Sequence, residues 1–465
     1  MLHTLSAMEQ ENEAAGTSKT SETGLGTLLA TDKLLSQLKS LALAVHLLIE
    51  KHNHASFWAP YIKTLPVTYG TCLYFTLDEL KALQGSPTFH SAIQVITNVS
   101  KHYSYVFDLL ENNSHIMHVA NFTWEEFIWA MSAVMSRQNN IPLTPLNDKQ
   151  PQALHQLSRQ QEFALIPAWD MCNHDNGKIT TFYDINSECT ECYATRNFKK
   201  GEQIYIFYGP RGNSELLLHS GFVFDNNNYD SLSVRMRLPD TTNVCLKEKF
   251  TLLHLCGFKM DKSFSLYNNF VPGELLAFLR LSAMNEEEVK VALLALQKPQ
   301  NNKEKEEDTK DQKEESTKFD PFRKYSERNE IAALAILANK CTQLLKAYPT
   351  SIEEDKKLLG GELSANMRSV VLLRLKEKEL LHNIIRMASS GHMSTQPPPA
   401  SASSSSTSST AGSASSPSSP SSSSKNGAPS ATASTGSKKK KRNRNRNKKK
   451  TDASASSSAP ATNQQ

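Results

Sequence analysis

Two short segments carry the polar side chains whose types and spacing could do chemistry. Asn173 and His174 end a mostly apolar run that begins at Ile166, and Tyr208 to Arg211 follow an alternating segment, Gln203 to Phe207. Alternation of this kind is typical of a half-buried strand, and binding or catalytic groups commonly lie on the loops that follow strands. The sequence therefore predicts a site where loops leave the strands of a small sheet.

A second group that could do chemistry is the pair Cys189 and Cys192, in the spacing Cys-X-X-Cys. Zinc or redox chemistry would need partner residues, and the sequence offers no second pair. We therefore expect these cysteines to flank the tip of a hairpin, without a metal. The seven cysteines form no framework of a secreted scaffold, and no signal peptide or apolar run of about 18 residues is found, which favours an intracellular soluble protein.

The charge of the chain is concentrated near its C-terminal end. The 465 residues carry a net charge of +5, but ten Lys or Arg and no acid lie within 438–450. The other 42 basic and 47 acidic residues make the rest of the chain mildly acidic, so nucleic-acid binding by the folded part finds no support. The basic cluster has two interpretations: a nuclear-import signal or nucleic-acid contact, or a solubilising tail that binds non-specifically. We expect a cytoplasmic location, with the nucleus added if the cluster is an import signal.

Helices are expected to precede the predicted sheet. Residues 1–26 form a polar lead that we expect to be flexible, and a helix with one apolar face begins after Thr31, a candidate N-cap. Two more helices are predicted over 78–84 and 91–110. Aromatic residues around Pro60, among them Tyr61, are expected to pack together rather than to contact a ligand. A capping-box pattern at Thr123 starts a helix that ends at the polar residues 136–139.

The remaining elements follow from the same periodicities. Short strands are predicted over 163–166, 179–185, 192–196 and 203–207, and a helical turn over 215–220 ends at Gly221. Beyond residue 231 only helices are predicted, over 245–256, 273–282, 285–296, 328–347, 350–358 and 363–387. The charged run 300–318 is expected to be a solvated loop. The Ser/Ala/Pro-rich segment past 390 is expected to be disordered, because it cannot bury enough apolar surface to offset its ordering entropy.

Several runs of sequence together carry a resemblance to a known family. They are SRQNNIP (136–142), LIPAWDMCNH (165–174), GEQIYIFYGPR (201–211), HSGFVFDNN (219–227) and SIEEDKKLL (351–359). These runs resemble the SET-domain methyltransferases, in the subclass of the Rubisco large-subunit methyltransferase, and within it the actin-histidine N-methyltransferases. The resemblance covers residues 26–390 and implies an α+β fold, with a SET β-core split by a helical insertion and followed by an all-α substrate-binding domain.

The resemblance also implies how the chain is divided. A flexible lead (1–26) precedes the helical insertion (27–137), the C-terminal part of the SET core (138–228), the helical substrate-binding domain (229–388) and a disordered tail (389–465). Relatives carry further SET strands with a Gly-rich turn before the insertion, and no such pattern precedes Thr31. Either the sequence represents an alternative or truncated gene product, or these strands are lost and the SET core is partial. In the second case we expect a cofactor pocket that is open on one side and strand edges that are unpaired.

The resemblance implies a pocket for S-adenosyl-L-methionine beside a peptide site, and no metal. Tyr208 corresponds to the active-site tyrosine, and Asn139 and Arg211 to residues that hold the target peptide, with Asn139 also acting in catalysis. Ile166, Trp169 and Ile206 would shape the substrate pocket. The cofactor would contact Arg137, Asp170, Met171, Cys172, Asn173, His174, Ser220, Gly221 and Phe222.

These residue types suit methyl transfer to histidine. Displacement at a sulfonium mostly requires alignment and exclusion of water, and a histidine with a pKa of about 6.5 already offers a lone pair at neutral pH. Asn139 could fix the tautomer, whereas a lysine with a pKa of about 10.4 must first lose a proton. We therefore expect a histidine of actin as the substrate. Two alternatives stay open: a lysine methyltransferase of the same subclass, and a truncated module that binds a substrate protein without turnover.

Overall fold

The computed structural model describes residues 2–3, 25–142, 161–184, 187, 189–238, 245–297, 319–391 and 393. Contacts divide the chain into one compact unit, residues 1–403, and a second unit, 404–465. Every described residue belongs to the first unit. The predicted charged loop 300–318 and the basic cluster 438–450 lie outside the described residues, as does nearly all of the predicted tail.

Helices make up the first part of the described chain. They are α2 (Leu25–Thr31), α3 (Lys33–Gln37), α4 (Lys39–His52), α5 (Ala59–Ile62), α6 (Leu77–Ala82), α7 (Pro87–Asn112) and α8 (Trp124–Arg137), with 3₁₀ turns at Cys72–Tyr74 and Val119–Asn121. The side chain of Thr123 caps α8 by accepting a hydrogen bond from the backbone N–H of Glu126, at 3.3 Å. Apolar faces of these helices meet in one core, where Leu43, Leu47 and Phe127 are fully buried. The predicted helical insertion is thus helical in the structure.

Two details of the lead and of the first helix were predicted wrongly. Leu2–His3 form strand β1, paired with β3, and α2 already begins at Leu25, whose buried side chain joins the core. The N-cap of α3 is Asp32 rather than Thr31. The Asp32 carboxylate accepts hydrogen bonds from the backbone N–H groups of Leu34 and Leu35, both at 2.9 Å. Residues 4–24, which make up most of the lead expected to be flexible, lie outside the described residues, so that expectation stays a prediction.

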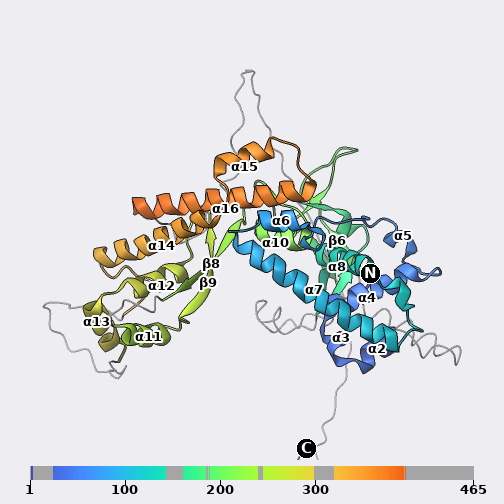
Figure 1. The fold of residues 1–465 in the computed structure, drawn as a ribbon, viewed down its shortest axis with the longest axis horizontal. Coiled ribbons are helices and arrows are strands. Elements are labelled where there is room, and N and C mark those ends of the chain that lie inside the picture. The colour runs from blue at the N-terminus through green and yellow to red at the C-terminus, as the bar shows by residue number, and fades with distance from the viewer. Residues whose placement is uncertain are drawn as a thin grey trace, which may run out of the picture. The chain divides into compact units, whose positions relative to one another are not determined.

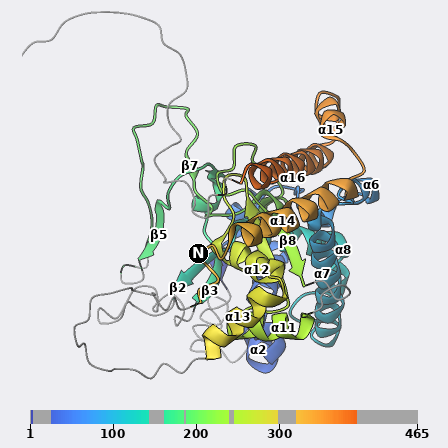
Figure 2. The same cartoon turned by 90° about the vertical axis from the view of Figure 1, so that its left-hand side faces the viewer.

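Three small sheets follow the helices (Figure 2). Strand β3 (Gln161–Leu165) lies between β1 and β2 (Asn139–Pro142) in an antiparallel sheet. Strand β4 (Asn173–His174) pairs in parallel with β7 (Tyr205–Ile206), and β5 (Thr181–Asp184) forms a hairpin with β6 (Cys189–Cys192). The predicted strand 192–196 therefore begins three residues and ends four residues too late. Cys189 and Cys192 lie along the strand, opposite Asp184 and Thr181, and do not flank the hairpin tip.

The second half combines helices with a strand pair that we did not predict. Its helices are α11 (Leu246–Leu255), α12 (Gly273–Ala283), α13 (Glu286–Gln297), α14 (Glu327–Ala347), α15 (Ile352–Leu359) and α16 (Ala365–Ser390). Strand β8 (Ser231–Arg237) pairs antiparallel with β9 (Asp261–Tyr267) along seven residues each. Leu232, Val234 and Met236 on β8 are buried and alternate with more exposed residues. The expectation of an all-α domain is therefore wrong, because this alternation belongs to a half-buried strand.

Helix α16 joins the two halves of the unit (Figure 1). Its Glu377 accepts hydrogen bonds from Ser86 Oγ (2.9 Å) and Thr88 Oγ1 (3.0 Å) at the start of α7, and from the Tyr348 hydroxyl (2.9 Å) after α14. Burial raises the pKa of Glu377 to about 7. One turn away, Arg374 pairs with buried Asp355 at 2.6 Å. A buried polar cluster thus connects the helical insertion to the C-terminal helices.

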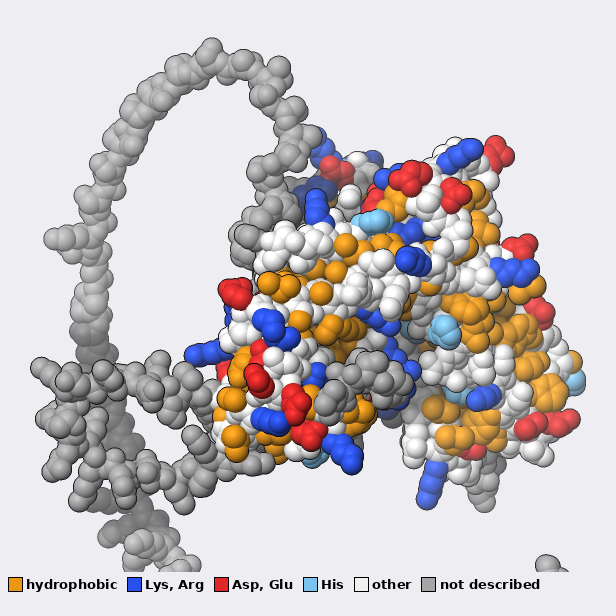
Figure 3. All heavy atoms as spheres, turned by 60° about the vertical axis from the view of Figure 1, so that its left-hand side comes forward, with side chains coloured by type: hydrophobic (Ala, Val, Ile, Leu, Met, Phe, Trp, Pro, Cys, Tyr) orange, Lys and Arg blue, Asp and Glu red, His pale blue; other side chains and the backbone are white. Residues whose placement is uncertain are grey.

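No helix in the described part of the chain is both long and apolar enough to cross a bilayer. On the face drawn in Figure 3, acidic and basic side chains lie interspersed among apolar ones rather than in a field of one sign. The expectation that the folded part does not bind nucleic acid stays a prediction.

Candidate functional site

The segment from Ile166 to His174 leaves the end of β3 through a strained turn. Ala168 has φ 71°, the only positive φ of a non-glycine residue among those described. Its ψ of −42° lies outside the left-handed helical region, and such a sparsely populated conformation costs about 1–3 kcal/mol, so the surrounding contacts must hold it in place. A single 3₁₀ turn, Trp169–Met171, follows before β4. Backbone strain therefore marks the segment in which seven of the fifteen predicted site residues lie.

Asp170 is the centre of a buried polar cluster in this segment. Its side chain is 0 % exposed, the Tyr61 hydroxyl donates to its Oδ2, and Arg137 Nη1 lies 3.8 Å from the same oxygen. Arg137 Nη1 also donates to the backbone carbonyl of Asp170, at 2.7 Å. Burial raises the pKa of Asp170, while the Tyr61 hydrogen bond and the Arg137 charge act against that rise. The end of α8 and the end of α5 are thus both tied to the predicted cofactor segment.

His174 and Tyr208 lie against each other where β4 and β7 end. The backbone N–H of Tyr208 donates to His174 Nδ1 at 3.2 Å, so this nitrogen is an acceptor and the ring proton resides on Nε2. The Tyr208 hydroxyl donates to the carbonyl of Cys172 at 2.7 Å. The two rings are 5.1 Å apart, and Phe222 packs against both. Burial lowers the pKa of His174 and raises that of Tyr208, so both rings are uncharged at neutral pH.

A buried amide fixes the loop that follows Tyr208. Asn213 is fully buried, and its Nδ2 donates to Asp230 Oδ2 at 2.8 Å while its Oδ1 accepts from the backbone N–H of Phe224 at 3.0 Å. Asn227 Nδ2 donates to the Arg211 carbonyl at 2.8 Å. The loop 222–230 is therefore bound to the 209–213 segment, so Phe222 and Tyr208 keep their relative positions.

Two glycines allow a close backbone contact beside the site. Gly221 ends a π-turn, Leu216–Ser220, with φ 82°. A Cβ added to Gly221 would lie 2.7 Å from the carbonyl carbon of Gly70, and one added to Gly70 would overlap the Gly221 carbonyl oxygen. This contact brings the 68–74 segment against Ser220 to Phe222. A cavity of about 460 Å³ is found here, lined by Tyr69, Gly70, Gly221 and the first turn of α16, among others.

Three of the predicted cofactor contacts carry buried polar atoms that have no hydrogen-bond partner within the described part of the chain. They are Arg137 Nε, Asp170 Oδ1 and Ser220 Oγ. One is a donor, one an acceptor and one can act as either. Buried polar atoms in native proteins are nearly always satisfied, so each of these atoms is a candidate contact for a polar ligand. None of the three residues lines this cavity or the hollow beside the β5–β6 hairpin, and the Arg137 side chain also interacts with the Tyr69 hydroxyl.

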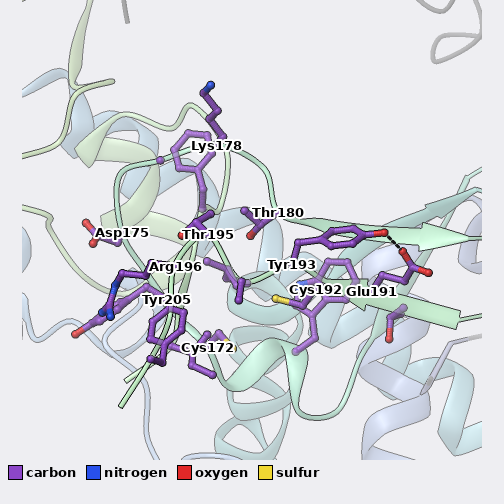
Figure 4. Close-up of a pocket in the computed structure, with 18 of the residues that line it drawn as sticks. Cys172, Asp175, Lys178, Thr180, Glu191, Cys192, Tyr193, Thr195, Arg196 and Tyr205 are labelled. Atoms are coloured by element: carbon purple, nitrogen blue, oxygen red, sulfur yellow. Dashed lines mark hydrogen bonds between the residues drawn. The ribbon is translucent and has the colours of Figure 1, made fainter. Parts of the chain in front are cut away.

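A second hollow, also about 460 Å³, lies between the 166–174 segment and the β5–β6 hairpin (Figure 4). Of the predicted site residues, it is lined by Trp169, Cys172 and Ile206, but not by Asn139, Tyr208 or Arg211. In Figure 4, Cys172 and Tyr205 stand on one wall, and Tyr193, hydrogen-bonded to Glu191, stands on the other.

The remaining predicted residues line neither of the two cavities. Asn139 Nδ2 donates to the Arg137 carbonyl at 3.0 Å, and Arg211 pairs with Glu215 at 3.4 Å. Ile166 is buried in a small cluster that Trp169 packs against. Met171 is 46 % exposed, and Asn173 pairs with Tyr205 in the β4–β7 sheet. The roles expected for these residues stay predictions.

No metal centre accompanies the site in the part of the chain that the structure describes, where no three His, Cys, Asp or Glu side chains are placed to hold an ion. Cys189 and Cys192 are exposed free thiols. Sequence reasoning missed the polar role of Tyr61, which does pack but also donates to Asp170, and the structural roles of Asn213 and Asp230. The available signal was that a buried tyrosine needs a partner for its hydroxyl.

Comparison with known proteins gives similarities to both halves of the chain. Residues 240–381 match the family described as Rubisco LSMT substrate-binding. Over 371 residues, the chain is 37 % identical to the actin-histidine N-methyltransferase of Papio anubis and 36 % identical to that of Homo sapiens. Each alignment covers 78 % of this chain and 58 % of the relative, so the chain spans less than two thirds of their length.

Solved structures support the architecture. The SET domain of LSMT bound to lysine and AdoHcy superimposes with a TM-score of 0.56 at 22 % identity, covering 78 % of each chain. The structure of Rubisco LSMT bound to sinefungin and monomethyllysine gives a TM-score of 0.56 at 23 % identity, again covering 78 % of each. The chain therefore has the fold of these SET-domain proteins, with a helical substrate-binding region.

Proposed function

We propose that this chain, a homologue of the actin-histidine N-methyltransferases, transfers a methyl group from S-adenosyl-L-methionine to a histidine of actin. The observation that carries the proposal is the commitment of Asn139 Nδ2 to the Arg137 carbonyl, at 3.0 Å. One N–H of the amide is thereby committed, which fixes the orientation of the side chain, and its oxygen is an acceptor that suits the N–H of a neutral imidazole. Because Arg137 is one of the proposed cofactor contacts, substrate and cofactor recognition would then lie two residues apart in the chain.

The residues present fit S-adenosyl-L-methionine. Arg137, Asp170 and Ser220 each offer a buried polar atom without a partner, in a mixture of donor and acceptor types. An amino acid joined to a nucleoside has both types of group along its length, so it can satisfy such a mixed set. When bound, this cofactor supplies an electrophilic methyl group on a sulfonium.

The protein's own groups would prepare the target ring for attack. A histidine with a pKa of about 6.5 is mostly neutral at pH 7 and has one nitrogen with a free lone pair. If Asn139 accepts the N–H of the ring, the opposite nitrogen keeps the lone pair and faces away from the amide. No general base is then needed, because the attacking nitrogen is already unprotonated.

Tyr208 would orient the transferred group. Its hydroxyl proton is committed to the Cys172 carbonyl at 2.7 Å, which leaves the lone pairs of the oxygen for weak CH···O contacts. Burial raises the pKa of this hydroxyl, so it stays protonated at neutral pH and keeps that orientation. The aromatic rings of Phe222 and His174 pack beside it and limit access of water.

The proposal is tested with the full chain, S-adenosyl-L-methionine and actin peptides, with mass spectrometry to locate the added methyl group. We expect methylation of a histidine, and preference for the native peptide over one with lysine at the same position. Asn139→Ala should lower kcat/KM about tenfold or more, as expected for loss of one substrate hydrogen bond. Preference for the lysine peptide would instead support a lysine methyltransferase. Binding of actin without methylation would support a binding module.

A further inference from the structure

We infer that Tyr61 is a positioning residue of the proposed cofactor site, which acts through Asp170 on the segment from Trp169 to His174. This inference rests on the proposed function, because it assigns Tyr61 to the binding of that cofactor. Tyr61 belongs to α5, in the helical insertion, and is separated from Asp170 by 109 residues.

The geometry makes the Tyr61 hydroxyl a main support of the Asp170 side chain. Tyr61 is 7 % exposed, and its hydroxyl donates to Oδ2 of a carboxylate whose side chain is fully buried. The nearest cation, Arg137, lies 3.8 Å from that oxygen, beyond hydrogen-bond distance, and Oδ1 has no hydrogen-bond partner. A buried carboxylate that loses its hydrogen bond is costly, so the position of Asp170 depends on Tyr61.

The position of Asp170 in turn sets that of the predicted cofactor contacts. Arg137 holds the Asp170 carbonyl at 2.7 Å, and Tyr208 holds the Cys172 carbonyl at 2.7 Å. The segment is therefore fixed at residues 170 and 172 immediately after the strained backbone of Ala168. Without the Tyr61 hydroxyl, relaxation of Asp170 would release this strain and move both Arg137 and the residues that follow.

Loss of the Tyr61 hydroxyl should also change the pKa of Asp170, which a loss of packing alone would not do. The groups that face Asp170 are Tyr61, Tyr69 and Arg137 from the insertion, and Cys172 and Tyr208 from the SET core. Burial raises the pKa of Asp170, and the Tyr61 hydrogen bond is the largest influence that lowers it. Removal of that hydroxyl should raise the pKa further. The pH below which Asp170 becomes protonated, and no longer attracts Arg137, should therefore move upward.

The test measures binding of S-adenosyl-L-homocysteine to the full chain by calorimetry over a range of pH, without any methyl transfer. The variants are Tyr61→Phe and the matched control Tyr103→Phe. Tyr103 lies in the same insertion, and its hydroxyl donates to a backbone carbonyl, that of Phe122, at 3.2 Å. We expect Tyr61→Phe to weaken binding about tenfold at neutral pH, the size expected for a hydrogen bond to a charged group. The acid limb of its binding curve should move to higher pH, and Tyr103→Phe should match the wild type in both respects.

The outcomes separate this inference from the proposed function. Unchanged affinity and an unchanged pH curve for Tyr61→Phe would overturn the inference, as would equal losses for the two variants. Tight, Tyr61-sensitive binding without actin methylation would support the inference and contradict the proposed function. Failure of the wild-type chain to bind S-adenosyl-L-homocysteine would overturn both.

Discussion

Gly221→Ala is expected to be one of the most damaging single-atom additions near the site. Gly221 has φ 82°, and a Cβ at this position would lie 2.7 Å from the carbonyl carbon of Gly70 and 2.9 Å from the backbone nitrogen of Thr71. Real Cβ atoms do not approach backbone atoms so closely, and the atoms it meets cannot rotate away as a flexible side chain would. The substitution must therefore separate the 68–74 segment from the end of the π-turn.

The magnitude has two contributions. A left-handed conformation costs a residue with a Cβ about 1–2 kcal/mol, and forcing an extra carbon into a packed contact typically costs about 1–3 kcal/mol. We therefore expect Gly221→Ala to lower the free energy of unfolding by about 2–5 kcal/mol, a large part of the usual 5–15 kcal/mol. Gly257→Ala isolates the first contribution, because Gly257 has φ 78° with nothing within 4 Å of the added carbon. Gly70→Ala isolates the second, because Gly70 lacks a positive φ.

Urea unfolding of the three variants and the wild type measures these costs. Gly221→Ala should have the lowest midpoint, and Gly257→Ala should lose about 1–2 kcal/mol. S-Adenosyl-L-homocysteine binding should weaken for Gly221→Ala and Gly70→Ala but not for Gly257→Ala, which is remote from the predicted cofactor contacts. A midpoint for Gly221→Ala equal to that for Gly257→Ala would show that the close backbone contact does not exist, and would refute the reasoning.

Two further predictions concern the buried charges of α16. The pKa of Glu377 is raised from 4.5 to about 7 in the folded state. Between pH 4.5 and pH 7 the folded protein therefore holds a proton that the unfolded chain has lost. The free energy of unfolding should fall by about 3 kcal/mol as the pH rises through this window. The urea midpoint of Glu377→Gln should therefore rise relative to that of the wild type from pH 4.5 to pH 7. A difference between the two midpoints that stays constant over this range would contradict the raised pKa of Glu377. Asp355→Ala leaves the buried cations of Arg374 and Lys378 without their partner, and should cost about 3–5 kcal/mol in urea unfolding. Asp261→Ala breaks an exposed ion pair on the β8–β9 ribbon and should change the midpoint far less, so equal losses would argue against a buried network.

Local chemistry allowed much of the fold to be predicted from the sequence. The capping residue Thr123 and the turn that ends at Gly221 were identified correctly, because each depends on residues within one or two turns. The β8–β9 ribbon was not predicted, although the period-two alternation of β8 is present in the sequence, because it lies among segments with helical periodicity. Asp32 displaced Thr31 as a cap because two suitable side chains are adjacent, and only the geometry selects between them.

Long-range partners could not be predicted in the same way. Burial of Tyr61 was expected from its aromatic neighbours, but the acceptor for its hydroxyl lies 109 residues later. The sequence likewise offers many glycines and gives no means to pair Gly70 with Gly221. Hydrogen-bond rules state that a buried donor must have a partner, whereas the identity of that partner depends on the tertiary fold.

The two contacts that join the insertion to the SET core should affect function in different ways. The backbone contact between Gly70 and Gly221 is part of the packing, so its loss should reduce stability and cofactor affinity together. The hydrogen bond from Tyr61 to Asp170 can be removed by deleting one oxygen, which leaves the packing of the ring in place. Its loss should therefore affect affinity and its pH dependence more than stability. If Gly221→Ala and Tyr61→Phe both lost affinity for S-adenosyl-L-homocysteine only in proportion to their loss of stability, the insertion would act as a scaffold alone. Asp170 would then have no part in shaping the proposed cofactor site.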